Sequence, residues 1–273
     1  MPDPLLAGIP LGHDVAYPKS YDPGLLFPVA RQDKRRTLPV HYEWVGADIW
    51  NAYEISWLNA HGKPVVGTAR FIFPQTSPNL IESKSLKLYL NSFNETHFEN
   101  SGTARLCMER DLSQAAGGQV DVSIDVGHTQ KSASQALDGV CIDDADVVID
   151  IYQRDPNLLR CLPAACTVTE SLMSDLLKSN CPVTGQPDWG SVQIRYTGRQ
   201  IDRAALLKYI VSFRRYDGFH EHCVEQMYSD IWQACRPESL LVYARYTRRG
   251  GLDINPWRSS TTAEVSQACT FRQ

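Results

Sequence analysis

The sequence predicts an α+β fold made of two tandem modules, each an antiparallel sheet with two consecutive helices. Apolar residues alternate in stretches typical of strands, and these stretches flank pairs of segments whose apolar residues recur at helical spacing. This order occurs twice along the 273 residues, and the two occurrences align at an offset of about 120 residues. Because such a module leaves sheet edges unpaired, we expect the modules and further copies of the chain to close into a barrel.

The domain organisation follows from changes in composition along the chain. We expect an N-terminal arm over residues 1–45, a first module over 46–135, a join over 136–170 and a second module over 171–273. The arm is rich in Pro, Gly and Asp and has little periodicity, and the join is polar and acidic. A hydrophobic content of 43% is enough for one large core or two ordinary ones.

Composition also limits the classes of partner. The net charge of -4 and the pI near 6.0 disfavour a general nucleic-acid binder. No segment approaches the roughly 20 apolar residues of a membrane span, and the N-terminus lacks the basic and apolar regions of a signal peptide. Eight cysteines are too sparse in this length for a disulfide framework. We therefore expect a protein of the reducing cytoplasm that binds neither nucleic acid nor membranes.

The first module begins with a predicted β-hairpin. Residues 48–58 and 64–73 are rich in Ile, Val, Phe and Trp, and turn-forming residues separate them. The elements expected next are a helix that starts near Glu82, a second helix over about 97–114 and a strand over 120–126.

The second module repeats this order. Its expected elements are a strand around 192–196, helices over 202–215 and 218–235, and a strand over 240–246. Tyr89 and Asp111 of the first module align with Tyr209 and Asp230 of the second, which indicates an ordered internal duplication.

Ser179–Gly190 is the stretch that carries reactive side chains. It places the thiol of Cys181 shortly before the carboxylate of Asp188, among Pro and Gly residues that predict a loop and exclude a helix or a central strand. A free cysteine is usually a small buried hydrophobe, and reactivity requires a setting that stabilises the thiolate. The first module has no thiol at the corresponding place but carries Glu82, Ser83 and Lys84 at a helix start. We therefore expect one composite site that uses parts of both halves.

A further cluster, Phe219–Cys223, contains two histidines and a cysteine. These residue types suggest zinc, but positions two apart on a helix point in different directions and cannot easily share one metal. His220 and Glu221 at the helix start fit ligand contacts better, although a capping Glu beside a hydrogen-bonded His is the simpler structural explanation. We expect no metal site.

Together these motifs resemble the NADPH-dependent 7-cyano-7-deazaguanine reductases, the nitrile reductases of queuosine biosynthesis. The matching motifs occur in the family's order and are Glu82–Tyr89, Asn180–Thr184 with Asp188, Phe219–Glu221 and Arg249–Pro256. The resemblance covers nearly the whole chain, and the length matches the bimodular branch. It implies a tunnelling fold related to the zinc-dependent GTP cyclohydrolases, without their metal, and we expect a homodimer.

The resemblance implies reduction of a nitrile to a primary amine by two NADPH molecules. Cys181 would add to the nitrile carbon and form a covalent thioimide. Asp188 would donate the proton, which requires a pKa raised by burial, with Trp189 as the expected neighbour.

The resemblance also implies the binding residues. Glu82 and Glu221 would accept hydrogen bonds from the ring N–H and NH2 groups of the base. Backbone groups of Ile81 and Ser83, the ring of His220 and a stacking Phe219 would complete that pocket.

For NADPH, the candidates are Ser83, Lys84, Arg249 and Gly250, whose N–H groups and positive charge suit phosphates. Lys87 and Arg248 are open candidates for the 2′-phosphate. No GxGxxG motif is present, so no Rossmann domain is expected.

Two alternatives remain open from the residues. One is a zinc-dependent cyclohydrolase of the same broad fold, with Cys181, His220 or His222, and Cys223 as ligands. The other is a non-catalytic purine- or pterin-binding module in which Glu82 and Glu221 bind a base and Cys181 is inert. Zinc content and nitrile-dependent NADPH oxidation distinguish these from the reductase.

Overall fold

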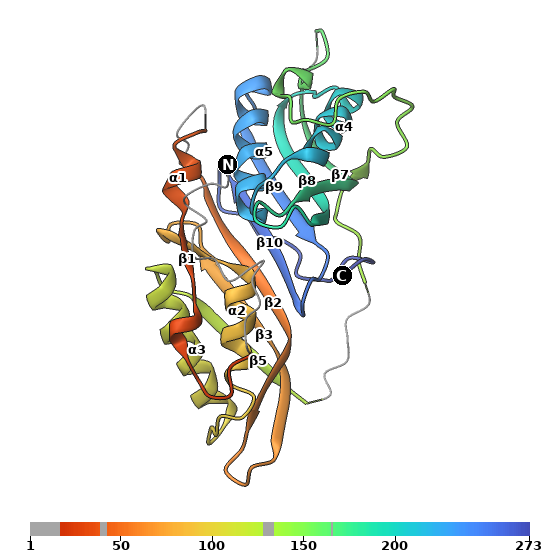
Figure 1. Cartoon of the computed structure of the whole chain (residues 1–273). Coiled ribbons are helices and arrows are strands. Elements are labelled where there is room, and N and C mark those ends of the chain that lie inside the picture. Colours follow the sequence, from red (N-terminus) through yellow and green to blue (C-terminus); the bar gives the residue numbers. More distant parts are fainter. Residues whose placement is uncertain (1–16, 39–42, 128–133, 165) are drawn as a thin grey trace. The chain divides into compact units, whose positions relative to one another are not determined.

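The computed structural model describes residues 17–38, 43–127, 134–164 and 166–273, and these residues form two compact units (Figure 1). The described residues of the first unit fall within Met1–Asp33, Asp48–Lys131 and Arg248–Ile254, and those of the second within Lys34–Ala47, Ser132–Thr247 and Asn255–Gln273. Each unit combines sheet and helix, which confirms the α+β class. No described helix is long and apolar enough to cross a membrane.

The first unit contains a sheet covered by two helices on one face (Figure 1). Its strand order is β5-β3-β2-β10. The strands are β2 (Val45–Leu58), β3 (Pro64–Pro74), β5 (Asp121–Val126) and the start of β10 (Leu252–Ser259). The helices are α2 (Ser83–Asn91) and α3 (Ser101–Ala116). A separate two-stranded sheet pairs β1 (Pro28–Ala30) with β4 (Asn79–Ile81). The predicted hairpin, both helices and the following strand are confirmed.

The second unit has the same layers, with α4 and α5 on one face of its sheet (Figure 1). Its strand order is β10-β9-β8-β7-β6. The elements are β6 (Val140–Cys141), β7 (Thr167–Asn180), β8 (Pro187–Arg199), β9 (Ser239–Tyr246), α4 (Arg203–Ser212) and α5 (His220–Cys235). The chain also contains the short helix α1 (Arg31–Arg35) and the 3-10 turns η2 (Pro23–Leu25), η3 (Pro156–Leu158) and η4 (Phe213–Arg215). The pair β6 and β7 is parallel, so the predicted all-antiparallel sheet is wrong at that pair.

Two long strands, β7 and β10, escaped prediction for identifiable reasons. The pairing of β7 with β8 shifts register between Ser174 and Leu177, and a bulge of this kind interrupts the alternation that marks a strand in sequence. In β10, the polar residues Asp253, Asn255 and Arg258 are all buried, so the stretch does not show the expected apolar face. The N-terminal arm was also expected to be irregular, but its described part contains β1 and α1.

Matching contacts in the two helix pairs support the duplication. The Tyr89 hydroxyl donates to Asp111 Oδ2 at 2.8 Å, and the Tyr209 hydroxyl donates to Asp230 Oδ2 at 2.6 Å. In each first helix, the serine three positions after the tyrosine donates to the tyrosine's own carbonyl at 2.6 Å. Since these bonds join residues that the sequence aligns, the two helix pairs share a packing scheme as well as a pattern.

A buried ion cluster in the second unit fastens α5. Arg258 donates through Nε at 3.0 Å and Nη2 at 2.7 Å to Glu225 Oε1, and Arg35 reaches the same carboxylate at 2.6 Å. Burial alone raises the pKa of Glu225, but the positive charges of Arg258 and Arg35 outweigh it, so the pKa lies well below its ordinary value. The carboxylate is therefore charged in the folded protein even at mildly acidic pH.

We expect Glu225→Gln to lower the free energy of unfolding at pH 7 by about 3–5 kcal/mol, because it leaves Arg258 buried without its anion. A depressed folded pKa stabilises the protein above the unfolded value of about 4.3, and this contribution is lost as the pH falls. The wild type should thus lose more stability than the variant between pH 6 and pH 3 in urea unfolding. The exposed Glu264→Gln serves as control, and an unchanged midpoint for Glu225→Gln at pH 7 would contradict the assignment.

Candidate active site

Cys181 lies in a closed turn between β7 and β8. Its N–H donates to the carbonyl of Gln186 at 2.9 Å, and its own carbonyl accepts from Gly185 N at 2.9 Å. Gly185 has φ 68, in the left-handed region that favours glycine. The cysteine is only 3% exposed. Both backbone groups of Cys181 are therefore held by the turn, which sets the position of its sulfur.

The prediction that all of Ser179–Gly190 is a loop is wrong at both ends. Ser179 pairs with Asp188 across the β7–β8 ladder, and Asp188 is thus a strand residue. Pro187 is tolerated because it is the first residue of β8. A Cβ at Gly190 would lie 3.2 Å from the carbonyl oxygen of Arg245, so a larger residue there would require this neighbour to shift by a few tenths of an ångström.

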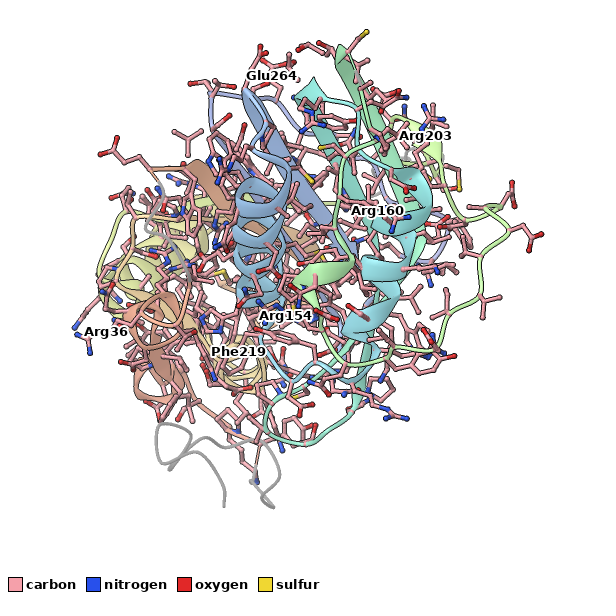
Figure 2. The ribbon with its side chains drawn as sticks, turned by 90° about the horizontal axis from the view of Figure 1, so that it is seen from above. Arg36, Arg154, Arg160, Arg203, Phe219 and Glu264 are labelled. Carbon is pink, nitrogen blue, oxygen red and sulfur yellow. The ribbon has the colours of Figure 1, made fainter. Side chains whose placement is uncertain are left out.

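A second segment runs beside the turn and brings in the start of α5. Asn180 N donates to the carbonyl of Tyr216 at 2.8 Å, and Gly218 N donates to the carbonyl of Asn180 at 3.1 Å. Phe219, which is labelled in Figure 2, follows as the N-cap of α5 and makes no side-chain capping bond. The residue before Cys181 is therefore tied to the residues that precede the predicted Phe219–Glu221 cluster.

Asp188 and His220 face each other in this unit. His220 Nε2 lies 3.8 Å from Asp188 Oδ1, and the imidazole meets the ring of Tyr246 edge-on with centroids 4.1 Å apart. Asp188 is 6% exposed, and Glu221 is 3% exposed. The second unit thus gathers the thiol turn, a buried carboxylate, an imidazole and a second buried carboxylate, all of which the sequence singled out.

Trp189 does not bury Asp188 as expected. Adjacent residues of a strand point to opposite faces, and Trp189 is 38% exposed with the guanidinium of Arg214 5.3 Å above its ring. On the side of Asp188, burial raises the pKa of the Cys223 thiol to about 12 and that of the Tyr246 hydroxyl well above its ordinary value. Two neighbours of Asp188 are therefore uncharged at neutral pH, while the cation of Lys178 also interacts with it.

Cys223 is a neutral core thiol. It is fully buried, and its sulfur donates to the carbonyl of Gly218 at 3.8 Å. Burial raises the pKa of this thiol to about 12. Across the described ranges, no group of three or more His, Cys, Asp or Glu side chains is arranged to hold a metal ion.

In the first unit, Glu82 caps α2. Its two carboxylate oxygens accept from Lys84 N at 2.9 Å and Ser85 N at 2.8 Å. Burial raises the pKa of Glu82, and these two bonds offset only part of that rise. The expectation that the Lys84 N–H is available to a phosphate is therefore wrong in this structure. Oε1 of Glu82 also accepts from the Ser83 hydroxyl at 3.4 Å, which leaves Oε2 with a further lone pair for a ligand.

Ile81 and its surroundings are fixed by a strand pair that the sequence did not predict. The Ile81 side chain belongs to the core of the first unit, and its residue pairs with Pro28 of β1. Glu82 N then donates to the carbonyl of Phe27 at 2.9 Å. The segment before Glu82 is thus held by the described end of the N-terminal arm.

The first unit also gathers several cations that suit a phosphate-bearing cofactor. A Cβ on Gly250 would lie 3.2 Å from Lys87 Nζ, and Gly250 has φ 61. The guanidinium of Arg248 lies 4.5 Å above the ring of Tyr53. Arg249 closes the turn of residues 249–252 by donating its N–H to the carbonyl of Leu252 at 2.9 Å. Tyr53 sits in a strand pattern and carried no sequence signal for this role.

The predicted site residues are thus divided between the units. Those of the first unit are Ile81, Glu82, Ser83, Lys84, Arg249 and Gly250, and those of the second are Cys181, Asp188, Phe219, His220 and Glu221. The composite site remains a prediction.

Comparison with known proteins identifies the family. A family model described as the N-terminal part of nitrile reductase, 7-cyano-7-deazaguanine-reductase, matches residues 17–124, and one described as QueF-like protein matches residues 187–265. A protein of Bordetella pertussis named NADPH-dependent 7-cyano-7-deazaguanine reductase is 57% identical over 272 residues, which cover 98% of this chain and 99% of the relative. The chain belongs to this reductase family.

Other reductases of the same name are similarly close. The one from Azoarcus sp. is 56% identical and covers 97% of this chain and 95% of its own, and the one from Chromobacterium violaceum is 54% identical, with 93% and 92% covered. A crystal structure of the archaeosine synthase QueF-Like in the apo form covers 38% of this chain and 99% of that chain at 17% identity, with a TM-score of 0.30, too low to support an argument about fold.

Proposed function

We propose that this chain reduces the nitrile of 7-cyano-7-deazaguanine to the primary amine of 7-aminomethyl-7-deazaguanine with two NADPH, a step of queuosine biosynthesis. The observation that carries the proposal is the identity of 57% with a named reductase over 98% of this chain. The buried thiol of Cys181 and the buried Asp188, at the two ends of one hairpin turn, support it.

The first step is addition of the Cys181 thiolate to the nitrile carbon. One C–N π bond breaks, the nitrogen takes up a proton, and a covalent thioimide forms. A thioimide accepts hydride more readily than a nitrile, which is the advantage of nucleophilic catalysis. The burial of Cys181 supports this role, because exclusion of water protects such an intermediate from hydrolysis.

Asp188 donates the proton that the nitrile nitrogen requires. After the first hydride reaches the carbon, the C–S bond breaks, its electron pair leaves with sulfur and an imine remains. A second hydride and another proton complete the amine. His220, 3.8 Å from Asp188, is placed to return a proton to the carboxylate between these events.

Glu82 and Glu221 accept the N–H groups of the base. Glu221 lies in the first turn of α5, where the helix dipole favours a negative charge. The bonds from the start of α2 fix the orientation of Glu82, so its remaining lone pairs point in defined directions. Backbone groups of Ile81 and Ser83 complete the recognition of the base, and Phe219 stacks on its plane.

NADPH supplies hydride when bound, and the cations of the first unit hold its phosphates. Since the Lys84 N–H is bonded to Glu82, the Lys84 side chain contributes, together with Lys87, Arg248 and Arg249. Gly250 lets the backbone approach, because any side chain there would meet Lys87.

We also infer a tunnelling fold in which two chains complete a barrel as a homodimer. The outer strands β5 and β6 support this, since each ends its unit's strand order among the described residues and an open edge invites pairing. A reducing cytoplasm suits an enzyme that needs a free Cys181.

Mixing the protein with 7-cyano-7-deazaguanine in the absence of NADPH should yield a species whose mass equals protein plus one substrate. Cys181→Ala should lack this adduct because no other thiol occupies the turn. Denaturing mass spectrometry provides the measurement, and Cys141→Ala, at an exposed cysteine, should retain the adduct. An undiminished adduct in Cys181→Ala would remove the nucleophile from this position.

Asp188→Asn should bind the base normally but oxidise NADPH at least about 100-fold more slowly, the usual range for loss of a general acid. Nitrile-dependent loss of NADPH absorbance measures this rate. Asp121→Asn, at an exposed strand position of the first unit, is the matched control. Turnover close to that of the wild type would exclude Asp188 as proton donor.

Glu221→Gln should weaken binding of the base by about 10–100-fold, the effect of losing a hydrogen bond to a charged acceptor. Calorimetric titration in a Cys181→Ala background isolates binding from covalent chemistry. Glu238→Gln changes an exposed carboxylate of the same unit and should leave affinity unchanged. Equal affinities for all three proteins would dismiss the base-reading role.

A further inference from the structure

A basic pocket in the second unit lies outside the residues assigned above. Its volume is about 610 Å³, and it is lined by Ile149, Tyr152, Leu176, Lys178, Val211, Arg214 and Arg215. Pockets of this size accommodate a nucleotide-sized molecule. The lining combines cations with aromatic and aliphatic side chains and includes no acidic residue.

The cations of this pocket have no ion pair with a carboxylate in the part of the chain that the structure describes. Desolvation, and then the charge of Arg214, lower the pKa of Lys178, while Asp217 and Asp188 act in the opposite direction. A cluster of like charges is unfavourable by itself. An anion bound among Lys178, Arg214 and Arg215 would relieve that repulsion.

The positions of these cations are fixed by contacts that leave donors for a ligand. Arg214 lies 5.3 Å above the ring of Trp189, and Arg215 lies 5.9 Å above the ring of Tyr152. Neither guanidinium makes a side-chain hydrogen bond within the described residues, so the planar N–H groups of both remain available to phosphate oxygens. Lys178 Nζ donates to the carbonyl of Arg214 at 2.7 Å and to Asn180 Oδ1, so one of its three protons remains.

The apolar part of the pocket suits a flat ring. Tyr152 and Leu176 both line it, and both are among the exposed large hydrophobic residues of the chain. Exposed side chains of this kind commonly mark a ligand site when they gather beside charged groups. A planar base can therefore lie against Tyr152 and Leu176 while its phosphates meet the cations.

We propose that this pocket binds a nucleoside phosphate, with Lys178, Arg214 and Arg215 on the phosphates and Tyr152 and Leu176 against the base. Lys178 and Trp189 are cross-strand partners, one step along the ladder from Ser179 and Asp188. A ligand in the pocket therefore contacts the same hairpin that carries the Cys181 turn. The shared chemistry is a phosphorylated nucleoside, and its source is either NADPH, held here and not by the cations of the first unit, or a free mononucleotide.

The test compares binding of NADPH, ATP and GTP to the full chain and to the double variant Arg214→Gln with Arg215→Gln. Calorimetric titration up to about 1 mM ligand should show wild-type binding of at least one of these nucleotides, weakened at least tenfold in the double variant. Arg195→Gln changes an exposed arginine of the same strand as Trp189 and should leave binding unchanged. Urea unfolding establishes that all three proteins fold equally well.

The arms of the experiment distinguish the two sources. If the pocket takes NADPH, the double variant raises the KM for NADPH and mononucleotides bind weakly. If it takes a mononucleotide, that binding is lost while the KM for NADPH stays constant. Absence of binding by all three nucleotides, or equal affinity in wild type and double variant, overturns the proposal. Because the loss of nucleotide binding is measured by titration, that result is independent of whether the nitrile is reduced, and only the KM comparison rests on the proposed function.

Discussion

The candidate site depends on one backbone contact, the pair of hydrogen bonds that tie Asn180 to Tyr216 and Gly218. This contact joins the end of β7 to the chain that enters α5. Without it, the Cys181 turn would be an ordinary hairpin tip, and Phe219–Glu221 would be an unrelated helix start. The bonds are made by main-chain groups, and they hold the residue before Cys181 next to the start of α5, which carries His220 and Glu221.

The two units show how one frame supports different chemistry. Each has a hairpin with a bonded turn, closed by Asn59 with Lys63 in the first unit and by Cys181 with Gln186 in the second. In both, the first helix begins at an acidic N-cap, Glu82 or Asp202, and carries a tyrosine bonded to an aspartate of the next helix. The two units therefore share their helix caps and buried hydrogen bonds, and they differ in the side chains that their hairpin turns carry.

Buried charge is handled in two contrasting ways in the second unit. Glu225 forms ion pairs with Arg258 and Arg35, which keep its carboxylate ionised and hold α5 in place. Asp188 faces His220 and lies near a thiol and a phenol that remain neutral. The first environment suits structure, and the second suits a carboxyl group that must give up and regain a proton. A single helix, α5, contributes to both.

Much of this protein was determined by sequence alone. The helices, the first hairpin, the duplication and the resemblance to nitrile reductases could be predicted because periodicity, turn chemistry and motifs are local properties. Only the tertiary structure decided that Asp188 belongs to a strand, that Glu82 caps its own helix and that Trp189 stacks with Arg214 away from Asp188. These outcomes depend on strand register and on contacts with residues distant in the chain. The local sequence around a residue does not specify which distant residues it will contact. The basic pocket has the same origin, since its lining comes from three separated segments of the chain.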